Sequence, residues 1–128
     1  MKYLIDTHVF LWFVSEDNKI SSKAISLIKD SKNKIFFSAA SAWELAIKTK
    51  LNRLKIKGDL ESFIIEQLSI NRFVPLSITI SHCLYTEQLP RIHKDPFDRM
   101  IIAQSILEDL PLISADRKIR KYKTTVIW

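Results

Sequence analysis

The sequence predicts an α/β domain with a mainly parallel sheet. Short apolar runs alternate along the chain with longer segments in which apolar residues recur at helical spacing. Strands that alternate with helices are typical of parallel sheets, because each return to the sheet needs a crossover connection. The 128 residues contain no repeat, low-complexity segment or Pro/Ser-rich linker. We therefore expect a single domain over residues 1–128.

The apolar runs give the predicted strands. The first, "KYLI", is expected to be buried, and the third is weakened by Pro75, which cannot donate a hydrogen bond to a neighbouring strand. The predicted strands are residues 2–5, 34–39, 73–76, 110–114 and 124–128.

The segments between these runs have helical character. Apolar residues recur at helical spacing from Ala24 to Ile28, and Ser21 or Ser22 can cap that helix. Gly58 and Asp59 break the chain before another helix. The predicted helices are residues 7–15, 21–32, 40–51, 60–70, 79–89 and 96–110, with a short basic helix at 117–122.

Composition narrows the classes of function. Hydrophobic residues make up 47%, which is enough for a core. The formal charge is 20 basic minus 14 acidic residues, or +6, which favours polyanions such as nucleic acid, although solubility alone explains it equally well. Cys83 is the only cysteine, so an internal disulfide and a Cys-rich zinc site are excluded. Gly58 is the only glycine, which excludes a Gly-rich phosphate loop.

The amino-terminal segment superficially resembles a signal peptide. Asp6 and His8 interrupt its apolar run, and the uninterrupted stretch Val9–Val14 is too short to span a bilayer. We therefore expect a soluble, cytoplasmic protein that does not associate with membranes.

Four acids lie where a parallel sheet would gather them. Asp6 and Asp116 follow predicted strands, Glu44 lies in the helix after the second strand, and Asp98 opens a long helix. Asp6 and Asp116 could instead cap helices. Glu44 could form a surface pair with Lys48. However, its helix is apolar on nearly every side, which is typical of a buried helix.

The segment "KDPFDRMIIAQ" contains two aspartates with different predicted roles. Asp95, Pro96, Phe97 and Asp98 fall on the N-cap, N1, N2 and N3 positions of a helix. An N-cap role accounts fully for Asp95, since proline is favoured at N1. It accounts only in part for Asp98, which we expect to be free to bind a ligand. Whether Asp95 also reaches that ligand stays open.

Clustered carboxylates need a compensating charge. Two like charges ~4 Å apart repel by roughly 4 kcal/mol at an effective dielectric constant of ~20. Such acids cannot all stay ionised unless a cation joins them or some take up protons. Oxygen ligands favour Mg²⁺ or Mn²⁺ over zinc. A metal held in this way can activate water for phosphodiester hydrolysis.

At these residues the chain resembles the PIN-domain family of metal-dependent ribonucleases, especially the VapC-like toxins of toxin–antitoxin pairs. The matching segments are "YLIDTHVFLW", "SAASAWELAIKTKL", "HKDPFDRMIIAQ" and "LISADRKI". The resemblance implies an α/β/α sandwich, RNA cleavage with Mg²⁺ or Mn²⁺, frequent homodimers and a small antitoxin that blocks the site. It assigns catalysis and metal binding to four residues, namely Asp6, Glu44, Asp98 and Asp116.

Other polar residues near these acids are candidates for substrate binding. A basic stretch runs from Lys48 to Lys57 and could be a track for the RNA backbone or merely a solvated face. Arg99 could pair with Asp95 or steady a metal ligand. His93 could contact a phosphate or a carboxylate, but we expect a structural role. We expect core or interface positions for the tryptophans, with base stacking by one of them as the less favoured alternative. The predicted substrate-binding residues are Lys48, Lys50, Arg53, Arg99 and Ser114.

The leading hypothesis is therefore a Mg²⁺-dependent endoribonuclease that acts as a toxin. Two alternatives stay open. The chain could be a non-catalytic RNA-binding or interaction module of the same fold, although all four acids are present. It could also be a nuclease that acts on DNA, because phosphodiester chemistry is shared and nothing in the sequence visibly selects a 2′-hydroxyl.

Overall fold

A five-stranded parallel sheet forms the centre of the protein. The computed structural model describes residues 1–128. The strand order is β3-β2-β1-β4-β5, and every neighbouring pair is parallel. The strands are β1 Lys2–Ile5, β2 Lys34–Ser38, β3 Val74–Leu76, β4 Leu112–Ile113 and β5 Val126–Ile127. Strand β3, which contains Pro75, lies at an edge of the sheet, where a missing donor is tolerated.

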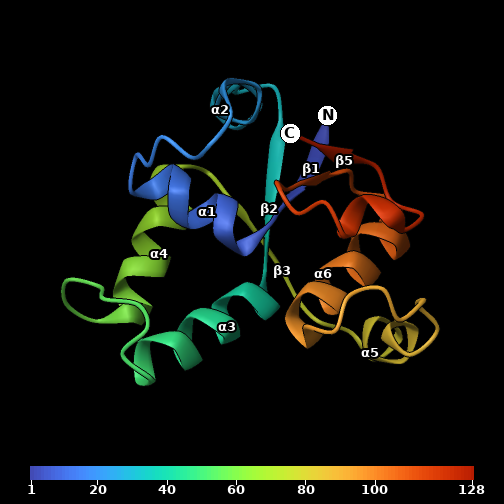
Figure 1. Ribbon diagram of the computed structural model, residues 1–128. Helices are drawn as coiled ribbons and strands as arrows, with labels where there is room; N and C mark the ends of the chain where they lie inside the picture. Colours follow the sequence, from blue (N-terminus) through green and yellow to red (C-terminus); the bar gives the residue numbers. More distant parts are fainter.

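Helices cover both faces of this sheet, so the predicted α/β sandwich is confirmed (Figure 1). Helices α1, α2 and α4 lie on one side, and α5 and α6 lie on the other (Figure 1). Helix α3 follows β2 at the carboxyl edge of the sheet (Figure 1). The helices are α1 Thr7–Val14, α2 Ser22–Lys29, α3 Ala39–Lys50, α4 Leu60–Ile70, α5 Ile80–Thr86 and α6 Pro96–Leu107, with a 3₁₀ turn η1 at Ile119–Lys121.

Side chains alternate between the two faces of each strand and build two cores. Tyr3 and Ile5 of β1 pack on the side of α1, α2 and α4, whereas Leu4 packs with α6 on the other side. The same alternation separates Ile113 from Leu112 in β4. Each strand of this central pair is thus buried on both sides, which explains its continuous apolar sequence.

Some predicted helices are shorter than expected. The segment 79–89 is helical only from Ile80 to Thr86, and the basic segment 117–122 forms a single 3₁₀ turn. The helix predicted at 96–110 ends at Leu107. Asp109 then adopts a positive φ of 53°, which turns the chain toward β4. None of the helices is long and apolar enough to cross a membrane.

Arg99 holds the loop between α5 and α6. Its side chain is buried and donates to the backbone carbonyls of Thr86, Leu89, Pro90 and His93 at 2.5–3.3 Å. All of these acceptors belong to the loop or the end of α5. The alternative that Arg99 pairs with Asp95 is therefore wrong, and its role as a substrate contact stays a prediction. Its charge is used inside the fold, because the carbonyls of an irregular loop otherwise lack partners.

Replacing Arg99 with lysine should destabilise the protein. An ammonium group cannot reproduce the planar fork that serves several carbonyls at once. We expect Arg99→Lys to lower the free energy of unfolding by about 1–3 kcal/mol, the usual cost of an unsatisfied buried partner. Urea denaturation measures this change. Arg91→Lys is the matched control, since the Arg91 side chain is 82% exposed. Equal stability of the two variants would contradict the structural role of Arg99.

Candidate active site

The carboxyl ends of the central strands place Asp6 in the interior. Ile5 pairs with Phe37 of β2 and with Ile113 of β4, so the residues that follow these strands meet at one edge. Asp6 occupies the N-cap position of α1, but its side chain makes no capping hydrogen bond. The Ser114 hydroxyl instead donates to Asp6 Oδ2 at 2.6 Å.

Two observations separate Asp6 and Ser114 from ordinary surface residues. Asp6 is only 3% exposed, and its Oδ1 is buried without a hydrogen-bond partner. Ser114 is fully buried, and its oxygen also accepts from the Asp116 N–H at 3.1 Å. Ser114 therefore orients two of the acids, and its predicted contact with substrate stays a prediction.

Helix α3 brings Glu44 to the same edge. The hydroxyls of Thr7 and Ser41 form a buried hydrogen bond of 2.7 Å, which ties the first turn of α1 to the first turn of α3. Glu44 lies one turn beyond Ser41 and is 5% exposed. The predicted pair with Lys48 exists, with 3.2 Å between Lys48 Nζ and Glu44 Oε2. It is not a surface pair, however, and Glu44 Oε1 is buried without a partner.

The start of α6 follows the sequence prediction. Asp95 is the N-cap, and its Oδ1 accepts from the N–H groups of Phe97 and Asp98 at 2.8 and 3.3 Å. Pro96 occupies the first helical position. The Asp98 side chain is 13% exposed and points away from this cap toward His93, with 3.1 Å between His93 Nε2 and Asp98 Oδ2. Asp95 thus caps the helix as the sequence predicted, whereas Asp98 is turned toward His93 and its role as a ligand stays a prediction.

His93 connects Asp98 with Asp116. Its Nε2 lies 2.8 Å from Asp116 Oδ2 and 3.1 Å from Asp98 Oδ2. Its Nδ1 accepts from the Asp95 N–H at 3.2 Å, so Nε2 carries the proton and donates to Asp116 Oδ2. Ligand atoms of these three residues, His93, Asp98 and Asp116, lie within 4.8 Å of one another. The alternative that His93 contacts a carboxylate is therefore confirmed.

The pKa values reflect this crowding. Burial, together with the charges of Asp6, Asp95, Glu44 and Asp116, raises the pKa of Asp98 to about 8. Burial also raises the pKa of Asp6, against the effect of the Ser114 hydrogen bond. The four acids are therefore close enough to act on one another electrically.

Asp116 differs from the other acids. Partial burial would raise its pKa, but the hydrogen bonds from the His93 ring and from the Lys118 N–H outweigh this effect and lower the pKa. Its side chain is 31% exposed, so Asp116 lies at the mouth of the cluster. Asp116 therefore stays ionised at pH values at which Asp98 still holds a proton, because their environments shift the two pKa values in opposite directions.

The basic residues at the end of α3 and in the following turn differ in how far they are exposed. The Lys48 side chain is 28% exposed and contacts Glu44. Lys50 and Arg53 are exposed beyond it, at the end of α3 and in the following turn. Both remain accessible to a polyanion, and their role as substrate contacts stays a prediction.

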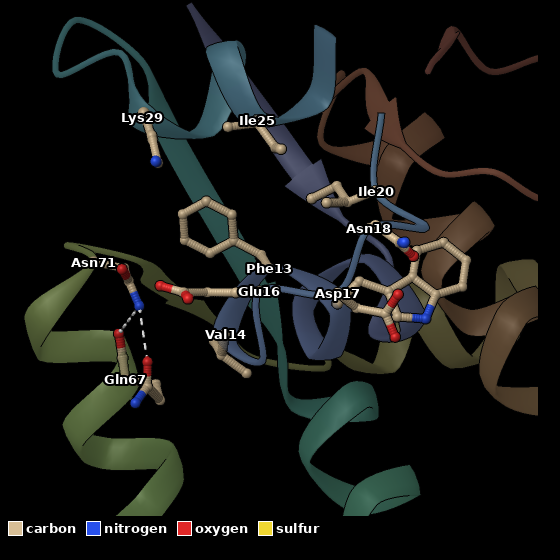
Figure 2. A pocket seen from close by; sticks show the side chains of 11 residues that line it. Phe13, Val14, Glu16, Asp17, Asn18, Ile20, Ile25, Lys29, Gln67 and Asn71 are labelled. Atoms are coloured by element: carbon tan, nitrogen blue, oxygen red, sulfur yellow. Dashed lines mark hydrogen bonds between the residues drawn. The ribbon is translucent and has the colours of Figure 1, made fainter. Parts of the chain in front are cut away.

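One hollow of the protein lies apart from the acids. It has a volume of about 510 Å³ and is formed by the end of α1 with α2 and α4 (Figure 2). Phe13, Ile20 and Ile25 give it apolar walls, and Asn71 bonds to Gln67 at its rim (Figure 2). None of the four acids lines it. Chemistry at the acids and binding in this hollow are therefore spatially separate.

Comparison with known proteins identifies relatives along almost the whole chain. The pattern of the PIN domain matches residues 3–124. Ribonuclease VapC22 of Mycobacterium tuberculosis (strain ATCC 25618 / H37Rv) is 28% identical over 121 residues, which cover 94% of this chain and 91% of that protein.

Solved structures share the fold at lower identity. A VapBC2 structure from Rickettsia felis, bound to a promoter DNA fragment, has a TM-score of 0.72 and 19% identity and covers 99% of this chain and 98% of its own. A VapBC-1 structure from nontypeable Haemophilus influenzae has a TM-score of 0.61 and 16% identity, with coverage of 99% and 97%. With a family match that spans nearly every element of the sheet and its helices, the chain belongs to the PIN-domain family.

Proposed function

We propose that this protein is a Mg²⁺-dependent endoribonuclease, with Mn²⁺ as an alternative metal, and the toxin of a toxin–antitoxin pair. The observation that carries the proposal is the convergence of Asp6, Glu44, Asp98 and Asp116 at one sheet edge, where the other three acids raise the pKa of Asp98. Burying several carboxylates together costs free energy unless a positive charge compensates them, so the cluster points to a bound cation.

The residues present fit a divalent cation. Asp6 Oδ1 and Glu44 Oε1 are buried carboxylate oxygens without a hydrogen-bond partner. Buried polar atoms are rarely left in this state unless an ion or a water serves them. The donors are oxygens, which suit Mg²⁺ or Mn²⁺. Asp6, Glu44, Asp98 and Asp116 would hold the ion.

Each side chain has a distinct part in the proposed reaction. When bound, the cation supplies Lewis-acid stabilisation of the phosphodiester and lowers the pKa of water. The Ser114 hydroxyl keeps Asp6 in place, and His93 Nε2–H keeps Asp116 in place beside Asp98. A carboxylate of the cluster takes the proton of the attacking water. Lys48 lies at the edge of the site, where its charge can attract a phosphate.

The relatives support RNA as substrate and a small antitoxin as partner. The curated relative is a ribonuclease, and both solved structures described above are VapBC structures.

A homodimer is also proposed, and exposed Ile80 and Leu84, one turn apart on α5, support self-association. Light scattering at micromolar concentration tests this point, and a purely monomeric mass would contradict it.

Cleavage of RNA by the purified protein should require both the metal and the buried acids. We expect Mg²⁺ to support cutting of labelled single-stranded RNA and EDTA to abolish it. Glu44→Gln should slow the reaction at least about 100-fold, because a lost metal ligand removes several kcal/mol of charge stabilisation. Glu66→Gln, a change at an exposed position of α4, should leave the rate unchanged.

Three outcomes would separate the competing functions. Cutting that ignores both EDTA and Glu44→Gln would contradict the mechanism. RNA binding without any cutting would favour a non-catalytic module, and faster cutting of matched single-stranded DNA would favour a DNA-directed nuclease.

In cells, inducible expression of the wild type should arrest growth, whereas expression of the Asp6→Asn variant should not. Equal arrest by both would count against catalysis as the cause.

The raised pKa of Asp98 should make the metal-free protein less stable as pH rises. The folded protein holds the proton up to about pH 8, whereas the carboxyl of the unfolded chain ionises near pH 3.8. The unfolded state therefore loses this proton first, and the free energy of unfolding falls between about pH 4 and pH 8. Asp98→Asn removes this loss. In EDTA, the gain in melting temperature from Asp98→Asn should be larger at pH 8 than at pH 5.

The matched control for this experiment is Asp109→Asn. Asp109 is exposed, and asparagine tolerates its positive φ. This variant should follow the wild type at both pH values. At pH 8, Mg²⁺ should raise the melting temperature of the wild type more than it raises that of the Asp98→Asn variant. A gain from Asp98→Asn that is equal at pH 5 and pH 8 would mean that Asp98 is not crowded by the other acids.

A further inference from the structure

An aromatic pair, one member of which is exposed, is formed by residues next in sequence to two of the acids. Trp43 immediately precedes Glu44 in α3, and Phe97 immediately precedes Asp98 in α6. Their rings meet edge to face, with 5.1 Å between centroids and an interplanar angle of 82°. Trp43 is nevertheless 61% exposed, although Glu44 beside it is buried. The sequence analysis expected a core or interface tryptophan, and the core alternative is therefore wrong for Trp43.

A hollow of about 330 Å³ opens at this pair. Its apolar wall is formed by Trp43, Phe97, Ile78 and Met100, and its cationic residues include Arg91 and Lys94. This volume is in the range of sites for small organic groups, which run from about 300 to 1,000 Å³. An apolar slot with a cationic rim matches one nucleotide, since the base is flat and apolar on its faces and the phosphate is anionic.

The charges at this rim favour a polyanion. Lys94 and Arg91 are both exposed, and the only acid that lines the hollow is Glu87, which contacts Arg91 at 3.7 Å. This contact joins two exposed side chains and is therefore weak. Lys94 has no carboxylate within salt-bridge distance. The chain as a whole carries a charge of +6. An uncharged protein partner would not use these cations.

From this arrangement we propose that Trp43 and Phe97 form a stacking platform for one unpaired RNA base next to the scissile phosphate. The slot is lined by residues of α3 and α6, the two helices that carry Glu44 and Asp98, although none of the four acids lines it. The Phe97 ring packs against the indole of Trp43, and aromatic rings offer a large contact area at low cost in conformational entropy. A base is available to such a platform only when it is unpaired. The substrate class is therefore single-stranded RNA or a loop. This proposal rests on the proposed function and adds how that site selects its substrate.

Binding without cleavage tests the platform directly. The probe is a fluorescein-labelled single-stranded 12-nucleotide RNA of mixed sequence, and its affinity for the full-length Asp6→Asn chain is measured by anisotropy in Mg²⁺. Adding Trp43→Ala should weaken binding about 10-fold or more, as expected for the loss of one stacked base. Trp43→Phe should retain most of the affinity. Leu51→Ala is the matched control, because Leu51 is an apolar residue of similar exposure, 55%, just beyond the end of α3, and it does not line the hollow.

A spectroscopic signal distinguishes stacking from a general loss of affinity. In a chain with Trp12→Phe and Trp128→Phe, Trp43 is the only tryptophan, and its fluorescence should be quenched by the single-stranded RNA. A duplex of the same sequence should quench it far less. Unchanged affinity in Trp43→Ala, or no quenching on binding, would overturn the proposal. So would a change in molar mass in Trp43→Ala with RNA affinity intact, because Trp43 would then serve a protein interface.

The outcomes also separate this proposal from the proposed function. Quenching and a Trp43-dependent affinity, without any cleavage by the wild type, would keep the platform and reject the nuclease. Metal-dependent cleavage with the same KM in the wild type and in Trp43→Ala would keep the nuclease and reject the platform.

Discussion

The mutual repulsion of buried carboxylates is the constraint on which the rest of the structure depends. Asp6, Glu44, Asp98 and Asp116 interact electrically at one edge of the sheet, where little water screens them. A domain is stable by only about 5–15 kcal/mol, so a cluster of this kind costs a large share of that stability. The fold tolerates it through fixed partners around the acids: the Ser114 hydroxyl, the Lys48 ammonium and the His93 ring.

The parallel sheet makes this concentration of acids possible. Because β1 lies between β2 and β4 in register, the residues after these strands meet at the centre of one edge. The hydroxyl pair of Thr7 and Ser41 then joins α1 to α3, and Arg99 holds the loop that leads into α6. These contacts are polar and buried, so each is satisfied only in one arrangement. The positions of the acids are thus set by partners that take no part in the chemistry.

Much of the fold could be predicted from the sequence because its signals are local. Each of these signals determines the structure of only a few neighbouring residues, and the elements they predict are present. They are the apolar runs, the proline after Asp95 and the interruption at Gly58. Glu44 was recognised as unusual because its helix is apolar on nearly every side. The contacts that could not be predicted join residues that are distant in sequence. Arg99 finds its acceptors up to 13 residues away in an irregular loop, and Ser114 meets Asp6 across 108 residues. No pattern in the sequence announces either contact.

The claim that these carboxylates are arranged around a divalent cation is tested most directly by diffraction from crystals grown with Mn²⁺, using its anomalous signal. We expect a peak about 2.0–2.3 Å from oxygens of Asp98 and at least one further acid of the cluster, with Asp6 Oδ1 or Glu44 Oε1 served by the ion or its water. Crystals that hold Mn²⁺ elsewhere, with these two oxygens still unpartnered and the four acids in place, would contradict the account.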